Sequence, residues 1–122
     1  MMEEKSFPCT SEGLVGAQSF LELQCDEPKP AIILDEIVSN IVRCSGASSF
    51  TIGVDRSETG LTMVFADDGK AFDPTREVAD PDISAGVEDR NIGGLGIFMV
   101  KKMSKSVSYR RESDRNVLTV VM

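Results

Sequence analysis

The sequence predicts an α+β fold, a two-layer α/β sandwich in which a mainly antiparallel mixed sheet carries helices on one face. Two stretches with apolar residues at helical spacing precede any strand pattern. Two pairs of alternating stretches follow, each pair joined by a short polar turn, and a further helical pattern lies between the pairs. The length of 122 residues fits a single domain, residues 1–122.

Helices are expected in three places. The first spans residues 11–25, where the apolar spacing is loose, and a proline-containing break at 26–30 separates it from the second. The second, residues 31–45, has the strongest apolar stripe, and Gly46 is placed to end it. The third spans residues 96–104, directly after a glycine cluster.

Four strands are expected in two hairpins. Alternation predicts the first hairpin over residues 49–55 and 60–66, and the closing hairpin over residues 106–111 and 116–122. Residues 67–91 are too polar and too rich in turn formers for regular structure throughout. This order of elements favours a sheet whose helices all lie on one face.

Composition narrows the class of protein. Hydrophobic residues make up 41% and charged residues 27% of the chain, as in ordinary soluble domains. The first residues lack a basic segment followed by an apolar run, and no stretch approaches the ~20 apolar residues of a membrane helix, so neither a signal peptide nor a membrane span is expected. Three well-separated cysteines without histidine argue against a disulfide framework or a zinc site and favour a reducing cytoplasm.

The net charge of −7 argues against a nucleic-acid surface, because phosphate backbones need clustered lysine and arginine. The same charge does not exclude a small anionic ligand. Surface charges farther than ~8 Å are largely screened at physiological salt, whereas oriented N–H groups and a bound cation act at contact distance.

The second predicted helix carries two polar residues at the margin of its apolar stripe. Glu36 and Asn40 lie one turn apart, so both can project from that edge into a cleft between helix and sheet. An asparagine oxygen suits Mg²⁺, and a nearby carboxylate can accept a proton from an attacking hydroxyl. The alternative is that both are solvated residues on the helix surface.

An acidic turn, Asp67-Asp68-Gly69, follows an apolar strand. One carboxylate at the strand end can accept a hydrogen bond from an adenine amino group, and Gly69 would let the ring approach the backbone. The alternative is an ordinary surface turn, because aspartate and glycine favour turns for conformational reasons.

A glycine cluster, Gly93-Gly94-Leu95-Gly96, opens into an apolar run. This pattern suits a flexible loop that presents backbone N–H groups to phosphate at a helix N-terminus. It matches neither a P-loop nor a dinucleotide-binding fingerprint, and the alternative is a plain hinge. Together, the three segments have the parts of an ATP–Mg²⁺ pocket.

The order and spacing of ILDEIVSN, DDGKAFDP and GGLGIFMVKK resemble the N box and the two glycine boxes of the Bergerat-fold (GHKL) ATPases, which include DNA gyrase and histidine kinases. Within that superfamily, the sequence is similar to the small bacterial anti-sigma factors that are also serine-protein kinases. The resemblance covers residues 31–122. It implies a histidine kinase-like ATPase domain that uses ATP and Mg²⁺ in the cytoplasm.

Carried over position by position, the resemblance gives each motif residue a role. Asn40 would bind Mg²⁺, and Glu36 would be the base that activates a substrate serine. Asp67, rather than Asp68, would meet the adenine amino group, with Gly69 beside the base. The remaining nucleotide contacts would be Gly93, Gly94, Leu95 and Gly96 near the phosphates, Thr119 near the adenine, and Arg90 as a candidate for the γ-phosphate.

Some positions depart from the family pattern. Ala71 stands where many members have a second glycine, which would make the approach to the nucleotide tighter. Cys44 stands where an aromatic residue or histidine is common after the N box. The lid arginine has no secure match, since Arg76 is a weaker second candidate beside Arg90.

The resemblance implies an enzyme, a protein-serine kinase in a partner-switching pathway. Such a protein phosphorylates a serine on a small anti-sigma-factor antagonist, sequesters a sigma factor, or does both, as a homodimer without direct nucleic-acid contact. One alternative is a nucleotide-sensing interaction module whose catalysis has lapsed. Another is an interaction domain that keeps only the fold. The presence of both Glu36 and Asn40 favours the kinase.

Overall fold

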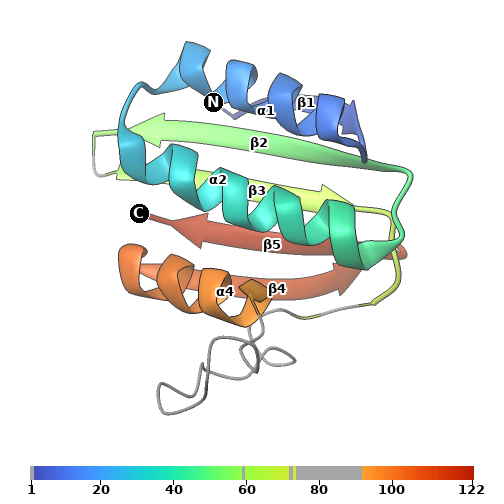
Figure 1. Cartoon of the computed structure of the whole chain (residues 1–122). Coiled ribbons are helices and arrows are strands. Elements are labelled where there is room, and N and C mark those ends of the chain that lie inside the picture. Colours follow the sequence, from blue (N-terminus) through green and yellow to red (C-terminus); the bar gives the residue numbers. More distant parts are fainter. Residues whose placement is uncertain (1, 59, 72, 74–91) are drawn as a thin grey trace.

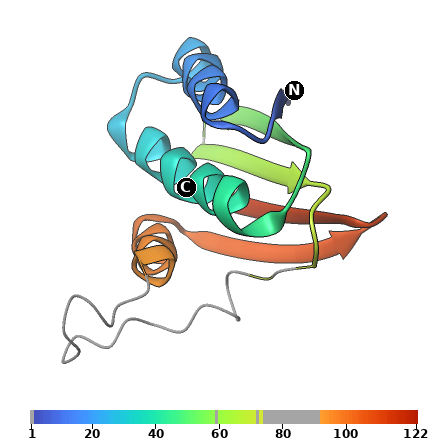
Figure 2. The same ribbon diagram turned by 45° about the vertical axis from the view of Figure 1, so that its right-hand side comes forward.

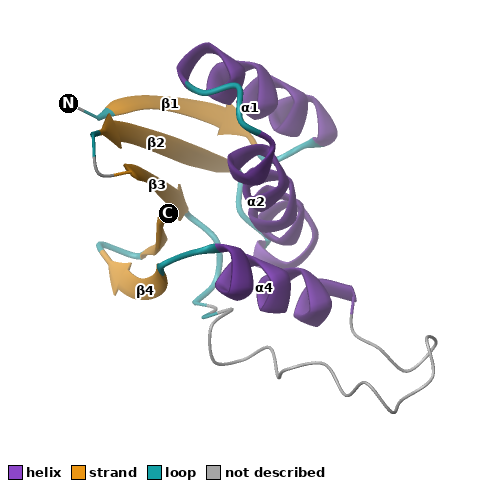
Figure 3. Cartoon of the chain, turned by 90° about the vertical axis from the view of Figure 1, so that its left-hand side faces the viewer, coloured by secondary structure: helices purple, strands orange, loops and turns teal. Residues whose placement is uncertain are grey.

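A computed structural model describes residues 2–58, 60–71, 73 and 92–122. Within these ranges, the chain forms a sheet of five strands in the order β1-β2-β3-β5-β4, and every neighbouring pair is antiparallel. The helices lie together on one face of the sheet, so the molecule has two layers (Figures 1 and 3). The predicted α+β sandwich is confirmed, and its described strands form an antiparallel rather than a mixed sheet.

The described α-helices are α1 (Ser11–Gln24), α2 (Pro28–Asn40) and α4 (Ile92–Met103). The first begins at a side-chain cap, because the Thr10 hydroxyl accepts a hydrogen bond from the Gly13 N–H at 3.1 Å. The second begins before the predicted residue 31 and has proline in its first turn. Proline is tolerated there because N–H groups in the first turn have no acceptor within the helix. None of these helices is long and apolar enough to cross a bilayer.

Of two further helix ends, one agrees with the prediction and one differs. After Asn40, the chain continues into a π-helical turn, Ile41–Ser45, and ends at Gly46, which has a φ of +67°. The predicted stop at Gly46 is therefore confirmed, and glycine allows this left-handed conformation without strain. The start of α4 was predicted at residue 96, but the helix begins at Ile92, so the glycine cluster lies inside its first turns.

The strands are β1 (Glu3–Pro8), β2 (Ser49–Ser57), β3 (Gly60–Asp67), β4 (Ser106–Glu112) and β5 (Arg115–Val121). The last four confirm the two predicted hairpins. The first was not predicted, because half of its residues are charged and only Phe7 is buried. It is an edge strand that pairs with β2 alone.

The core lies between the sheet and the helices. Alternate residues of β2 and β3 point toward the helices, which follows from the two-residue period of a strand. The central helix α2 lies between α1 and α4 (Figure 2) and buries most of the predicted apolar stripe. Its buried members are Ile33, Leu34, Ile37, Val38 and Ile41. At about 1.5–3 kcal/mol per buried aliphatic side chain, this packing fixes α2, and hence Glu36 and Asn40, on the sheet.

Candidate functional site

The C-terminal ends of α2 and β3 meet at one end of the sandwich. The contact is direct: the Lys70 N–H donates to the carbonyl oxygen of Ser45 at 3.0 Å. Ser45 ends the π-helical turn that follows Asn40, and Lys70 follows the acidic turn at the end of β3. The first two motifs found in the sequence are therefore brought together by the fold.

Asp67 is the inward-facing aspartate of the acidic turn. It is only 4% exposed, and its Oδ1 accepts hydrogen bonds from the Gly69 N–H at 2.9 Å and from Asn116 Nδ2 at 3.0 Å. Among the described residues, Oδ2 accepts none. The side chain is thus held by one oxygen while the other remains an acceptor for a further partner.

Asp68 makes different contacts from Asp67. It is exposed, and it accepts hydrogen bonds from the Ser48 hydroxyl at 2.6 Å and from the backbone N–H groups of Ser48 and Ser49 at 2.9 and 3.3 Å. The hydrogen bond from the Ser48 side chain, followed by those from the backbone, lowers the pKa of Asp68 below its ordinary value. Asp68 therefore fastens the start of β2 to the turn, which agrees with the choice of Asp67 as the ligand-facing carboxylate.

Gly69 is required by contacts inside the protein. A Cβ at this position would lie 2.4 Å from the carbonyl oxygen of Ser45 and 2.7 Å from its Cβ. A side chain there would push the acidic turn away from the end of α2. The predicted approach of a base to the Gly69 backbone stays a prediction, but the glycine has a structural reason of its own.

Asn40 is buried, with 9% of its surface exposed. Its Oδ1 accepts a hydrogen bond from the Arg43 guanidinium at 3.0 Å, whereas its buried Nδ2 has no hydrogen-bond partner among the described residues. A buried donor without a partner costs about 1–3 kcal/mol, so such an atom in a fold calls for an explanation. A phosphate oxygen or a metal-bound water at this position would supply the missing acceptor.

The amide of Asn40 fits a magnesium–nucleotide complex in one of two ways. As oriented here, the amide offers Nδ2, which suits an acceptor rather than a cation. Direct coordination of Mg²⁺ would need Oδ1, and therefore an amide turned over and released from Arg43. No cluster of three acidic, cysteine or histidine side chains occurs in the described part of the chain, so phosphate oxygens and water would supply the other ligands, as is usual for Mg²⁺.

Glu36 lies one turn before Asn40 and is half-buried. It lines an open pocket of about 400 Å³ between the first turn of α1 and the last turns of α2. The other lining residues are Ser11, Leu14, Ser39, Val42 and Arg43. A carboxylate at the wall of an open pocket can meet a side chain that arrives from a second protein.

The π-helical turn directly follows Asn40. Its last residue is fixed by two hydrogen bonds, one from the Ser45 hydroxyl to the Ile41 carbonyl at 2.7 Å and one from the Ala47 N–H to that hydroxyl oxygen at 3.1 Å. Single π-turns inside helices occur frequently at functional sites. Here the π-helical turn brings the Ser45 carbonyl to the acidic turn. An unbroken α-helix would place this carbonyl differently.

The helix α4 presents the third motif. A helix leaves its first four N–H groups without intrahelical partners, and in α4 these are the groups of residues 92–95. Gly93, Gly94 and Leu95 lie within this turn and Gly96 follows it, so the predicted backbone donors belong to a helix rather than to a preceding loop. Arg90 and Arg76 lie outside the described residues.

Thr119 does not join the site. It pairs with Val64 of β3, whereas Asp67 pairs with Asn116. Because side chains alternate along a strand, Thr119 faces the side of the sheet away from the helices, opposite to Asp67. Of the two predicted adenine contacts, Thr119 is therefore placed away from the acidic turn.

Three residues near Asp67 were not found from the sequence: Tyr109, Arg111 and Asn116. The Asn116 amide, 5% exposed, links the Asp67 carboxylate to the Tyr109 hydroxyl and the Arg111 guanidinium. The only signal in the sequence is an asparagine at the start of an otherwise apolar strand. Its importance depends on the strand register, which places Asn116 directly opposite Asp67.

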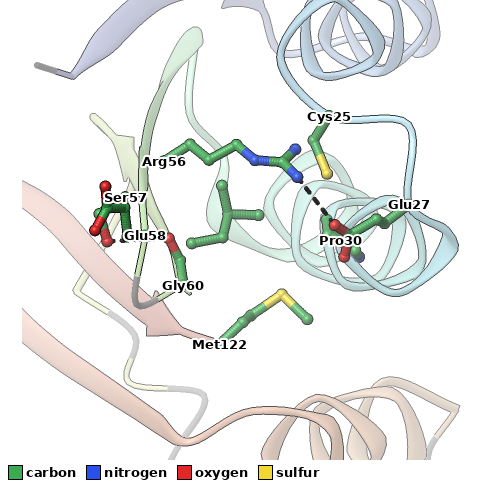
Figure 4. Close-up of a pocket in the computed structure, with 9 residues that line it drawn as sticks. Cys25, Glu27, Pro30, Arg56, Ser57, Glu58, Gly60 and Met122 are labelled. Atoms are coloured by element: carbon green, nitrogen blue, oxygen red, sulfur yellow. Dashed lines mark hydrogen bonds and ion pairs between the residues drawn. The ribbon is translucent and has the colours of Figure 1, made fainter.

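A second pocket, of about 330 Å³, lies at the other end of the sheet (Figure 4). Its lining includes Cys25, Leu61 and Met122, together with an ion pair between Arg56 and Glu27 at 3.1 Å. Both partners of the ion pair are more than half exposed, at 52% and 60%. None of the predicted site residues lines this pocket.

Comparisons with known proteins identify the family of the chain. The model of the histidine kinase-like ATPase domain family matches residues 24–122. The serine/threonine-protein kinase BtrW of Bordetella bronchiseptica is 30% identical over 92 residues, which cover 70% of this chain and 63% of that protein. The chain thus spans less than two thirds of the length of that relative.

A solved structure shares the fold. The histidine kinase AdeS of Acinetobacter baumannii superposes with a TM-score of 0.59 at 14% identity, over 98% of this chain and 66% of that one, again just under two thirds. At this identity the likeness concerns the fold alone, and it agrees with the antiparallel sheet and one-sided helices seen here. Because the family model matches most of the chain, the protein belongs to the histidine kinase-like ATPase domain family, within the Bergerat-fold superfamily.

Proposed function

We propose that this protein is an ATP-dependent protein-serine kinase and anti-sigma regulator. It would bind ATP with Mg²⁺ and would phosphorylate a serine on a small antagonist protein, sequester a sigma factor, or do both, acting as a homodimer in the cytoplasm. The observation that carries the proposal is the buried amide of Asn40, whose Nδ2 has no hydrogen-bond partner among the residues that the structure describes and which lies at the same end of the fold as the inward-facing Asp67. Membership of an ATPase family and similarity to a serine/threonine kinase support it.

The nucleotide would be bound by groups from three elements. Asp67 would accept the adenine amino hydrogen bond through Oδ2, next to Gly69. Asn40 would face the phosphates and their cation, which supplies charge neutralisation when bound. The first turn of α4, with Gly93, Gly94, Leu95 and Gly96, would donate backbone N–H groups to phosphate oxygens, helped by the positive end of the helix dipole. Arg90 stays a candidate for the γ-phosphate.

Phosphotransfer would use Glu36 as the base. The serine oxygen of the substrate forms a bond to the γ-phosphorus, the bond from that phosphorus to the β,γ-bridging oxygen breaks, and ADP leaves. The serine proton passes to the Glu36 carboxylate. The open pocket between α1 and α2, which Glu36 lines, supports this role, because a serine side chain from another protein could enter it.

One observation favours a second function. In this structure the Arg43 guanidinium holds Asn40 Oδ1, the atom that Mg²⁺ would need for direct coordination. A protein fixed in that arrangement would bind nucleotide without transferring phosphate, as a nucleotide-sensing module in a partner-switching pathway. The two functions differ in phosphotransfer and not in ATP binding.

The first experiment measures ATP binding. Calorimetric titration with ATP and Mg²⁺ is expected to give a saturable isotherm, and the same nucleotide is expected to raise the melting temperature, because a ligand that binds only the native state stabilises it. Asn40→Ala should abolish both effects. If millimolar ATP leaves the wild-type melting temperature unchanged, the proposal of a nucleotide-binding protein is wrong.

The second experiment separates the kinase from the sensor. Glu36→Gln keeps the shape of the side chain but removes the base, so it should keep ATP affinity and lose transfer of labelled phosphate to serine of proteins from the native cell. Glu22→Gln, on the exposed surface of α1, is the matched control. If Glu36→Gln transfers phosphate as fast as this control, Glu36 is not the base, and if the wild type transfers none, the sensor is the better reading.

A further inference from the structure

We propose that Asn116 is a positioning residue that orients Asp67 and thereby sets the preference for adenine. The proposal rests on the proposed role of Asp67 as the acceptor of the adenine amino group. It concerns a different residue, on a different strand, which would touch the nucleotide only through Asp67. Asn116 lies in β5, where it pairs directly with Asp67 of the neighbouring strand β3.

The amide of Asn116 has partners on both sides. Nδ2 donates to Asp67 Oδ1 at 3.0 Å and to the Lys70 carbonyl oxygen at 2.8 Å. Oδ1 accepts from the Tyr109 hydroxyl at 2.6 Å and from the Arg111 guanidinium at 3.2 Å. Since Nδ2 faces two acceptors and Oδ1 faces two donors, only one orientation of this amide satisfies all of them.

The same group of side chains fixes the acidic turn. Arg111 also donates to the Gly69 carbonyl oxygen at 2.8 Å, and it pairs directly with Asn116 across the β4–β5 hairpin. Asn116 therefore binds the first residue of the turn through its carboxylate and the segment after the turn through the Lys70 carbonyl. This set of contacts links the acidic turn to the edge strand β4, far from it in sequence.

The physical consequence concerns the direction of the Asp67 side chain. The N–H donors on Oδ1 fix the rotation of the carboxyl group, so that Oδ2 stays an acceptor in a set direction. Adenine offers an amino hydrogen at position 6, whereas guanine and hypoxanthine, the base of inosine, have a carbonyl oxygen there. An acceptor fixed in this direction would bind adenine in preference to the other two bases.

The test compares ATP with inosine triphosphate, which differs from it at position 6 of the base. For the wild type, ATP should bind about 10–100-fold more tightly than inosine triphosphate, the usual worth of a buried hydrogen bond to a charged group. In Asn116→Ala, the affinity for ATP should fall roughly 10-fold while that for inosine triphosphate stays the same. A merely structural role would weaken both nucleotides equally.

Asn116→Asp provides a second readout and keeps the shape of the side chain. It puts an acceptor in place of the amide donor to Asp67 Oδ1, while the partners Arg111 and Tyr109 keep an acceptor at position 116. The preference for ATP over inosine triphosphate should therefore fall in this variant as it does in Asn116→Ala.

The single tyrosine makes the integrity of the network measurable. The chain has one tyrosine and no tryptophan, so its intrinsic emission comes from Tyr109 alone. Loss of the Asn116 partner should change this emission in the nucleotide-free protein, while far-ultraviolet circular dichroism shows that the fold is kept. If Asn116→Ala does not fold, Tyr109→Phe, which removes one donor to the amide, should give a smaller loss of the same preference.

Each outcome has one meaning. A variant Asn116→Ala with the wild-type ratio of affinities, or with equal losses for both nucleotides, overturns the positioning role while the proposed function stands. A wild type that does not prefer ATP, together with an Asp67→Asn variant of unchanged affinity, removes the adenine role of Asp67 and the present proposal with it.

Discussion

Replacing Gly69 by alanine tests how closely the acidic turn must approach the end of α2. The added methyl group would meet backbone atoms of Ser45, with its oxygen at 2.4 Å and its carbonyl carbon at 2.9 Å. Backbone cannot rotate away as a flexible side chain can, so the two segments must separate. The hydrogen bond from the Lys70 N–H to the Ser45 oxygen, 3.0 Å long, lies in the same contact and would be lengthened.

The expected loss of stability is the sum of the cost of the added methyl group and the cost of the weakened hydrogen bond. Inserting a methyl group into a tightly packed site costs about 1–3 kcal/mol, and loss of one hydrogen bond costs about 0.5–1.5 kcal/mol. Gly69→Ala should therefore lower the free energy of unfolding by roughly 2–4 kcal/mol. For a domain of this size, each kcal/mol shifts the melting temperature by roughly 3–5 °C, so a decrease of roughly 6–20 °C is expected.

The assay is unfolding by urea followed through the emission of the single tyrosine, with ATP affinity measured on the same samples. Gly46→Ala is the control, because Gly46 has a φ of +67° but no atom within 4 Å of an added Cβ. That variant should lose about 1–2 kcal/mol through backbone strain alone and keep its ATP affinity. Unfolding of Gly69→Ala within about 0.5 kcal/mol of the wild type would refute the packing argument.

Two further predictions use other contacts of the same end of the fold. Since hydrogen bonds lower the pKa of Asp68, its contribution to stability is present above its ordinary pKa of 3.8 and is lost as the pH falls through the lower folded value. Asp68→Asn should therefore lower the melting temperature at neutral pH and have less effect in acid; an equal decrease at both pH values would contradict this. Arg43→Met releases Asn40 Oδ1, so it should raise the affinity for ATP in the presence of Mg²⁺ but not in its absence, as titrations with and without chelator will show. An unchanged Mg²⁺ dependence would mean that Arg43 does not restrain the amide.

Periodicity was enough to predict most of the fold. The patterns of α1, α2 and the two hairpins arise because one face of each element is buried. The spacing of the apolar residues in the sequence identifies that face. The edge strand β1 was missed for the same reason, since only Phe7 of its residues is buried. The early start of α4 was missed because glycine disfavours helices, and tertiary packing against α2 overrides that preference here.

The candidate site was predictable only in part. Motif order located Glu36, Asn40 and Asp67, because each motif is local in sequence. The partner of Asp67 was not predictable, since a one-residue change of register between β3 and β5 would put Arg115 or Val117 in the place of Asn116. The same register decides that Thr119 lies on the opposite face of the sheet from Asp67, which the sequence alone did not show. Long-range register therefore decides which polar side chains join a motif that is itself visible in the sequence.

The structure also links the two halves of the proposed nucleotide site through a single residue. Ser45 ends the turn that begins after Asn40, and its carbonyl oxygen binds the Lys70 N–H beside Asp67. Two further hydrogen bonds restrain Ser45, one from its hydroxyl to the Ile41 carbonyl and one to that hydroxyl from the Ala47 N–H. A shift of the acidic turn on binding a base would therefore reach Asn40, where the phosphates and their cation are proposed to bind. Weakening the base contact at Asp67 should for this reason also weaken the dependence of binding on Mg²⁺, a coupling that two separate subsites would not show.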